Sequence, residues 1–330
     1  MKTINKLILA LIASIAAVSF SGCTNSEVNV QESIEITLRP STILSGFTPY
    51  QSSNFEMYSD SKNGVSKLRI TCLIYDSTGK LCFSKESSLN DFNEEVTFTA
   101  QSVNDGSSYT MVAFATCILG SLSSPSIEAY SIKNTGYIDQ LKVELDVDFS
   151  NSYYSSWSVM GYAVREIRDE KSLIVNMEPG TALVYLQYKD IHAEDNIDAY
   201  AFGWYCNSIM QFSSYIPKYS QSSEDNLVLS ILEPASYTES NNIYEMYNAF
   251  PGSVNVMGFT TIGNDVEVVA SEKISLDKGH QYVFSLDCAS FKLTAEEAVL
   301  GAKSASDDFD SCASSPFGPV RKLNIPQRHF

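Results

Sequence analysis

Hydrophobic and polar positions alternate along most of the chain with a period of two. The alternation covers Ile34–Leu38, Leu68–Tyr75 and Val96–Thr99, and it is clearest in Leu141–Phe149, where apolar and charged residues take turns. In Leu68–Tyr75 the second face is only partly polar. Neighbouring side chains of a strand point to opposite faces of its sheet, so the pattern predicts antiparallel sheets with one face buried.

Turn signals and residue preferences support the same interpretation. Tyr75–Leu81 is typical of a hairpin in which Gly79 adopts a positive φ, and the 19 tyrosines of the chain favour strands. Helical patterns are few. The best of them is Thr294–Lys303, where Thr294 is a candidate N-cap and Glu297 follows it in the first turn.

The strand-rich segments fall into two blocks, separated by a Ser- and Tyr-rich break and a charged stretch. The predicted fold is all-β, with two tandem antiparallel β-sandwiches. The expected organisation, by residue number, is a signal peptide (1–22), a tether (23–33), an N-terminal β-sandwich (34–150), a linker (151–171), a C-terminal β-sandwich (172–293), and a short helix with a flexible tail (294–330).

The chain begins with a leader that has the features of an export signal. Lys2 and Lys6 precede the apolar run Leu7–Phe20, which is too short to serve as a membrane anchor of about 20 residues. The next residues, Ser21-Gly22-Cys23, resemble the end of a bacterial lipoprotein signal, in which the cysteine becomes the acylated first residue. The alternative is an ordinary cleaved signal, with Cys23 lost or left free.

Acylation of Cys23 would attach the protein to a membrane without any spanning segment. Each buried CH₂ contributes roughly 0.8 kcal/mol, so two or three chains hold a protein firmly. We therefore expect an outer-membrane lipoprotein that faces the cell surface. The formal net charge of −17 excludes nucleic acid as a partner, because an acidic surface repels phosphates.

Six further cysteines follow the leader, at Cys72, Cys82, Cys117, Cys206, Cys288 and Cys312. Exported proteins permit disulfides, but this density is far below that of a disulfide scaffold. Several of the six lie within apolar, strand-like runs, where a free thiol behaves as a small hydrophobe. Mostly free, buried thiols are expected. Cys72 and Cys82 flank the hairpin and would pair only if the register places them opposite each other.

The sequence offers no convincing catalytic or metal-binding motif. A Gly-x-Ser-x-Gly elbow, a zinc motif and a phosphate loop are all missing, and His192, His280 and His329 lie in unrelated contexts. Ser306–Ser311 groups three carboxylates but lacks the glycine and the bidentate glutamate of a calcium loop. We predict no catalytic residue, no metal and no cofactor. A carboxylate pair for glycoside hydrolysis stays open, because none is singled out.

Aromatic residues are the remaining candidates for ligand contact. Tyr153, Tyr154 and Trp157 cluster at the break between the blocks, and Trp204 lies in a strand. Exposed aromatic faces bind sugars, whereas buried ones fill cores and seams. Packing is the favoured interpretation, because aromatic-rich strands are common in sandwiches. The four residues are kept as candidate glycan contacts.

Two pairs of short motifs resemble the fimbrillin family, surface pilus proteins of gut and oral anaerobes. The first pair is the hairpin with Tyr75, Asp76 and Gly79, followed by a strand with Gly106, Tyr109, Val112 and Ala113; late strands in Phe250–Asp287 resemble the family's final hairpin. The resemblance implies two transthyretin-like sandwiches on a lipoprotein precursor. It also implies polymerisation in which a trypsin-like protease removes the first strand and a neighbour's strand fills the groove.

This sequence departs from the polymerising pattern at two points. The strand to be removed is Ser33–Leu38, but the basic residue after it, Arg39, precedes Pro40, a bond that trypsin-like enzymes cut poorly. The C-terminal tail also lacks an alternating donor strand. We therefore expect a non-enzymatic, lipid-anchored protein of adhesion or fimbrial assembly: an anchor, a tip or an accessory subunit. Its expected partners are other fimbrial or surface subunits, bound by strand complementation, and a host or glycan ligand is a further candidate. The alternative is a glycan-binding surface lipoprotein of a polysaccharide-uptake system.

Overall fold

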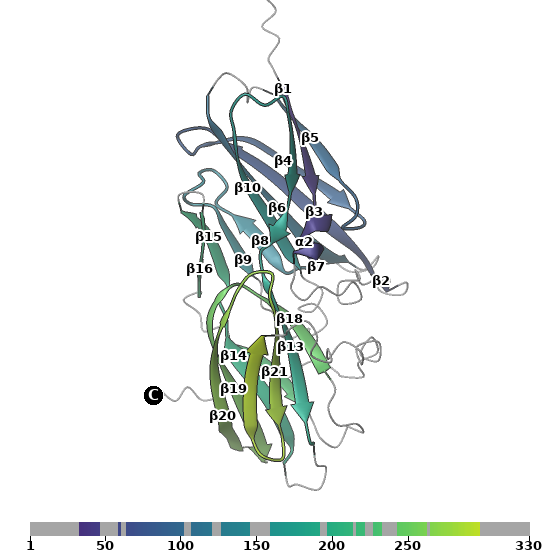
Figure 1. The fold of residues 1–330 in the computed structure, drawn as a ribbon, viewed down its shortest axis with the longest axis vertical. Helices are drawn as coiled ribbons and strands as arrows, with labels where there is room; N and C mark the ends of the chain where they lie inside the picture. The colour runs from purple at the N-terminus through teal and green to yellow at the C-terminus, as the bar shows by residue number, and fades with distance from the viewer. Residues whose placement is uncertain are drawn as a thin grey trace, which may run out of the picture.

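The protein is an elongated all-β molecule of two modules in series (Figure 1), which confirms the predicted fold class. The computed structural model describes residues 33–46, 59–60, 64–101, 107–120, 127–145, 159–191, 197–213, 216–221, 227–232, 243–262 and 265–297. The only helix in these ranges is the short α2 (Ser41–Ser45). The predicted signal peptide and most of the tether lie outside the described residues.

The N-terminal module stacks three sheets. A three-stranded sheet has the order β11 (Ser172–Asn176), β1 (Ser33–Arg39), β5 (Val96–Gln101). The seven-stranded sheet runs β12 (Glu178–Pro179), β10 (Met160–Ile167), β6 (Tyr109–Gly120), β3 (Gly64–Tyr75), β2 (Ser59–Asp60), with β4 (Leu81–Leu89) on β3 and β7 (Ile127–Glu128) on β6. The third sheet has the order β16 (Ile216–Ser220), β15 (Ile209–Ser213), β9 (Lys142–Leu145), β8 (Tyr130–Lys133).

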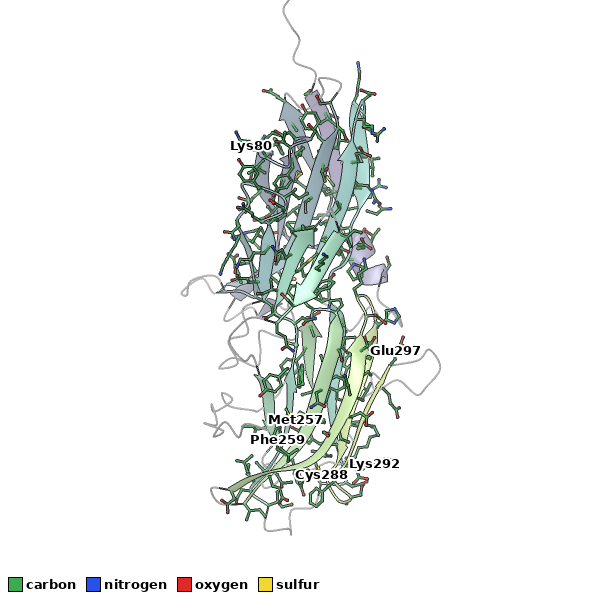
Figure 2. The ribbon with its side chains drawn as sticks, turned by 90° about the vertical axis from the view of Figure 1, so that its left-hand side faces the viewer. Lys80, Met257, Phe259, Cys288, Lys292 and Glu297 are labelled. Carbon is green, nitrogen blue, oxygen red and sulfur yellow. The ribbon has the colours of Figure 1, made fainter. Side chains whose placement is uncertain are left out.

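The C-terminal module is a sandwich of two four-stranded sheets. One has the order β18 (Ile243–Ala249), β13 (Ala182–Lys189), β21 (Gln281–Asp287), β22 (Lys292–Glu297), and the other β17 (Leu227–Leu232), β14 (Ala199–Tyr205), β19 (Gly252–Ile262), β20 (Asp265–Leu276). Figure 2 shows Cys288 and Lys292 at the far end of this module and Glu297 closer to the other one, so β22 runs back toward the junction.

The seven-stranded sheet is buried on both faces, which explains the pattern of β3. Ile70, Cys72 and Ile74 enter the core shared with the three-stranded sheet. Leu73 and Tyr75 enter the core shared with the β16-β15-β9-β8 sheet. The second face of Leu68–Tyr75 is only partly polar because it is covered by protein at one end rather than by water.

The predicted hairpin is confirmed. β3 and β4 pair in antiparallel register, and Gly79 has a φ of 80° in the turn between them. The carboxylate of Asp76 accepts hydrogen bonds from the backbone N–H groups of Thr78 and Lys80, at 2.9 and 3.0 Å. The Thr78 hydroxyl donates to the same carboxylate at 2.6 Å, and this bond, followed by the backbone bonds, lowers the pKa of Asp76.

The predicted module boundaries need correction in three places. Residues 151–171 are no linker throughout, because β10 pairs with β6 inside the seven-stranded sheet. Strand β11 and the β15–β16 hairpin fall within the predicted C-terminal block, yet they pair with β1 and β9 of the first module. The start of Thr294–Lys303 is strand β22 rather than helix, because pairing with β21 supplies its backbone hydrogen bonds.

The two modules meet at the turn between β20 and β21. Lys278 Nζ donates to Tyr162 Oη at 2.7 Å and pairs with Glu178 Oε2 at 2.9 Å. Gly279 has a φ of 74°, and a Cβ there would lie 2.7 Å from the carbonyl oxygen of Gly46, so only glycine fits. Burial is the main cause that raises the pKa of Tyr162, and the charge of Glu178 adds to it.

Candidate functional site

The candidate site is the first strand of the N-terminal module. β1 lies between β5, with which it is antiparallel, and β11, with which it is parallel. The predicted alternation of β1 is confirmed, because the side chains of Ile34, Ile36 and Leu38 are fully buried. Removing β1 would therefore separate β5 from β11 and open an apolar groove over the first core.

Arg39 ends this strand, and its peptide bond to Pro40 is held from several sides. The Arg39 carbonyl accepts hydrogen bonds from the backbone N–H of Met177 at 3.2 Å and from Thr42 Oγ1 at 2.9 Å. Pro40 is buried. The side chain is more accessible, with Arg39 Nε 2.7 Å from Glu95 Oε1 in a half-exposed ion pair.

Helix α2 follows directly and fixes the chain after Pro40. Ile43 N–H donates to the Pro40 carbonyl at 2.9 Å, and the Ile43 side chain is fully buried in the first core. Thr42 Oγ1 also lies 2.6 Å from the carbonyl oxygen of Met177. A protease must bind residues on both sides of the scissile bond in extended form, and here the residues after the bond are helical and partly buried.

The three-stranded sheet has β5 and β11 as its two edge strands. Among the described residues, each of them pairs only with β1. On β11 the side chain of Ile174 is 57% exposed, which is unusual for a large apolar residue. An edge strand with an exposed isoleucine offers backbone hydrogen bonds and apolar area to an added strand.

The candidate glycan contacts fall into two groups. Trp204 is fully buried, with its ring centroid 5.1 Å from that of Tyr247 and 5.8 Å from that of Phe284. Packing is therefore its role, because an inward position on β14 places it in the C-terminal core, and a sugar cannot stack on it. Tyr153, Tyr154 and Trp157 lie outside the described residues.

The cysteines follow the prediction of free, buried thiols. Cys72, Cys117, Cys206 and Cys288 are free and buried, and burial raises the pKa of each thiol to about 12. Cys82 forms no disulfide with Cys72; its side chain is exposed, and its thiol donates to the Ile74 carbonyl at 3.2 Å. Cys23 and Cys312 lie outside the described ranges.

The described ranges contain no cluster of metal-binding side chains: no three or more His, Cys, Asp or Glu side chains are grouped there in a way that suits a metal ion. His280 lies in the β20–β21 turn, with Nδ1 2.7 Å from Glu297 Oε1. His192, His329 and Ser306–Ser311 lie outside the described part. Within that part, no helix has the length and apolarity that a membrane crossing requires.

Sequence reasoning missed the junction contacts. The turn at Asp277–His280 is visible in the sequence, but nothing local indicates that Lys278 meets Tyr162 and Glu178 across the module boundary. The only available signal was the run of Asp, Lys and Gly that marks a tight turn, and it carries no information on a partner distant in the chain.

The fold and the position of the first strand define a class of protein. It is a protein of two β-sandwich modules in which the first strand, β1, occupies the centre of a sheet in its own module. The chain belongs to the family of fimbrillin-A associated anchor proteins Mfa1 and Mfa2, whose sequence model matches residues 68–295. This match confirms the fimbrillin resemblance. A search of curated proteins gives no match.

Several solved structures from Bacteroides and Parabacteroides species have a similar chain path. A candidate adhesin from Bacteroides ovatus has 14% identity and a TM-score of 0.47, and the match covers 81% of this chain and 94% of that one. A candidate polysaccharide-binding protein from Bacteroides thetaiotaomicron has 12% identity and a TM-score of 0.45, with 81% and 99% covered. A fimbrial assembly protein from Parabacteroides distasonis has 11% identity and a TM-score of 0.38, with 81% and 95% covered.

Proposed function

We propose that the protein is a non-enzymatic, lipid-anchored surface protein that keeps its first strand and serves as an anchor or accessory subunit of a fimbrium. The observation that carries the proposal is the state of β1. Its apolar residues are fully buried, and the carbonyl of the bond after Arg39 is occupied by two hydrogen bonds. A subunit that retains this strand has no open groove for a neighbour's strand, so it ends a polymer rather than extending it.

Membership of the anchor protein family supports the same assignment. Cys23 supplies the membrane attachment through acyl chains, and residues 24–32 form the tether between the lipid and β1. We place the protein in the outer membrane, facing the cell surface. Partner subunits are expected to add a strand at the β11 edge beside Ile174, where an apolar side chain is already exposed.

Limited proteolysis tests the retained strand. The full-length protein is incubated with an Arg-specific protease, and the products are read by N-terminal sequencing. No fragment starting at Pro40 is expected. The matched variant Pro40→Ala removes the proline but keeps the sheet. It separates two reasons why the bond after Arg39 resists cleavage: the proline that follows it, and the folded structure around it. A clean cut after Arg39 in the wild-type protein contradicts the proposal and favours a polymerising subunit.

Metabolic labelling with radioactive palmitate tests the anchor. The wild-type protein is expected to carry label, and the Cys23→Ser variant is expected to carry none and to leave the membrane fraction. An unlabelled wild-type protein would remove the lipid from the proposal.

The glycan-binding alternative now depends on Tyr153, Tyr154 and Trp157, since Trp204 has no exposed ring. A glycan array that compares the wild type with Trp157→Ala tests that alternative directly.

A further inference from the structure

A polar pocket lies on the C-terminal module, on the sheet formed by β17, β14, β19 and β20. It has a volume of about 360 Å³ and is lined by Tyr205, Gln221, Ser253, Asn255 and Lys273. None of these residues belongs to the first strand or to the junction. The inference drawn from them goes beyond the proposed fimbrial role and does not depend on it.

Strand alternation gathers three of the lining residues into one row on the outer face. On β14, Trp204 points into the core, so Tyr205 points outward. On β19, the buried Val254 and Val256 flank Asn255, which therefore points outward as well. Asn255 is the register partner of Lys273 on β20. The row thus presents an aromatic ring, an amide and an ammonium side by side.

The other two lining residues flank this row, Gln221 from outside the sheet and Ser253 from β19 itself. Gln221 directly follows β16, and this end is fixed because Ser208 N–H donates to the Ser220 carbonyl at 3.0 Å. Ser253 begins the exposed face of β19, after a turn that Asn207 holds by donating to the Pro251 carbonyl. The β15–β16 hairpin of the first module lies next to the β17-β14-β19-β20 sheet of the second (Figure 1). Gln221, at the end of that hairpin, therefore completes a lining whose other four residues come from the C-terminal module.

The pocket is positive inside a strongly negative protein. Lys273 is its only charged lining residue, and it takes part in none of the ion pairs among the described residues. Glu272 precedes it on β20, so alternation directs that carboxylate to the other face. The net charge of −17 acts weakly here, because charges more than about 8 Å away are screened at physiological salt.

We infer that this pocket binds a saccharide unit that carries a carboxylate, such as a hexuronate residue of a polysaccharide. The amides of Gln221 and Asn255 offer donors and acceptors that match neighbouring sugar hydroxyls. The Tyr205 ring supplies a face for the C–H side of a sugar, and Lys273 pairs with the carboxylate. The volume is at the low end of the roughly 300–1,000 Å³ range of small-molecule sites, which suits one or two sugar rings.

The test is a titration of the full-length protein, in mild detergent, with digalacturonate and with its neutral counterpart galactobiose. Saturation-transfer NMR reports contact, and calorimetry reports affinity. The wild type is expected to prefer digalacturonate about tenfold, as one charge-assisted hydrogen bond allows, and to lose this preference in 0.5 M NaCl. Lys273→Met is expected to abolish the preference while leaving the affinity for galactobiose unchanged. Tyr205→Ala is expected to weaken both sugars about tenfold.

Lys292→Met is the matched control, because it removes the same charge from the far end of the module, away from the pocket (Figure 2). It is expected to bind both sugars like the wild type. All three side chains are at least partly exposed, so unchanged thermal melting of each variant shows that it is folded. The inference is overturned if neither sugar binds, if Lys273→Met keeps the preference, or if inorganic phosphate displaces digalacturonate at equal concentration.

Discussion

The two modules bury their apolar side chains between different numbers of sheets, three in the first and two in the second. In the N-terminal module the seven-stranded sheet is covered on both faces, with one core toward β11-β1-β5 and another toward β16-β15-β9-β8. In the C-terminal module two four-stranded sheets share one core, and each keeps an outer face. The difference determines which surfaces are exposed. In the first module the central sheet is covered on both faces, whereas in the second a sheet face stays exposed and can hold a polar pocket.

Each module carries its own reporters of local unfolding. Cys72 and Cys117 lie in the first core, and Cys206 and Cys288 lie in the second. Burial raises the pKa of all four thiols to about 12, so at pH 8 they are protonated and shielded from alkylating reagents. Opening of either module exposes its pair of thiols with an ordinary pKa, and peptide mass spectrometry then tells which module opened.

The largest expected effect is in the second module. Trp204→Ala removes a fully buried ring that contacts Tyr247 and Phe284, and it should cost about 4 kcal/mol in the free energy of unfolding. Labelling of Cys206 and Cys288 at pH 8 should accelerate, while Cys72 and Cys117 stay protected. The exposed-aromatic control Tyr137→Ala should change little. Equal acceleration in both modules would show that they unfold as one unit and would break the comparison.

The first strand gives the next largest effect, and it does so in the other module. Ile36→Ala leaves a cavity at the centre of β1 and should cost about 3 kcal/mol. Cys72 and Cys117 should now label faster, because their core loses the strand that covers it. Thr37→Ala, at the neighbouring outward position, is the matched control and should cost less than about 1 kcal/mol. An Ile36→Ala protein with full protection of both thiols would argue against a structural role for β1.

The junction should give a smaller effect that sharpens the comparison. Lys278→Met removes the ammonium from Tyr162 and Glu178 but keeps most of the side-chain length. A partly exposed ion pair and one hydrogen bond are together worth about 1 kcal/mol. If these contacts couple the modules, denaturant unfolding followed by the two thiol pairs should split into more widely separated transitions. A uniform shift of both transitions would instead indicate that other contacts couple the modules.

Sequence reasoning succeeded where the signal is local. Alternation in Ile34–Leu38 and the turn glycine Gly79 depend on neighbouring residues, and both are as predicted. Strand β10 was missed because it lies between two cores, so its apolar residues show no alternation with polar ones. The assignment of β15–β16 to the wrong module has another cause: alternation identifies a strand, but the identity of its partner depends on residues far away in the chain.

The same reasoning explains which parts of the site were predictable. The Arg39–Pro40 bond is visible in the printed sequence, and the proline alone is enough to predict that trypsin-like enzymes cut it poorly. The hydrogen bond that Met177 N–H donates to the Arg39 carbonyl is not visible there, because it requires β11 to lie beside β1. Trp204 was ambiguous for the same reason, since one aromatic residue in a strand points inward or outward according to register.

The smallest effect concerns the ion pair that caps the first strand. Arg39 and Glu95 are both half-exposed, and exposed pairs of this kind contribute less than about 0.5 kcal/mol, so Glu95→Gln should leave the thermal unfolding curve of the protein almost unchanged. It should also leave the Arg39–Pro40 bond intact toward an Arg-specific protease, because protection comes from the backbone hydrogen bonds and the buried proline rather than from the side chain. Wild-type protein in 1 M NaCl, where the pair is screened, is the control and should behave in the same way. The opposite outcome is cleavage in Glu95→Gln and in high salt, but not in the wild type at low salt. It would mean that the surface ion pair, rather than the sheet, protects the bond after Arg39. Retention of the first strand would then depend on salt.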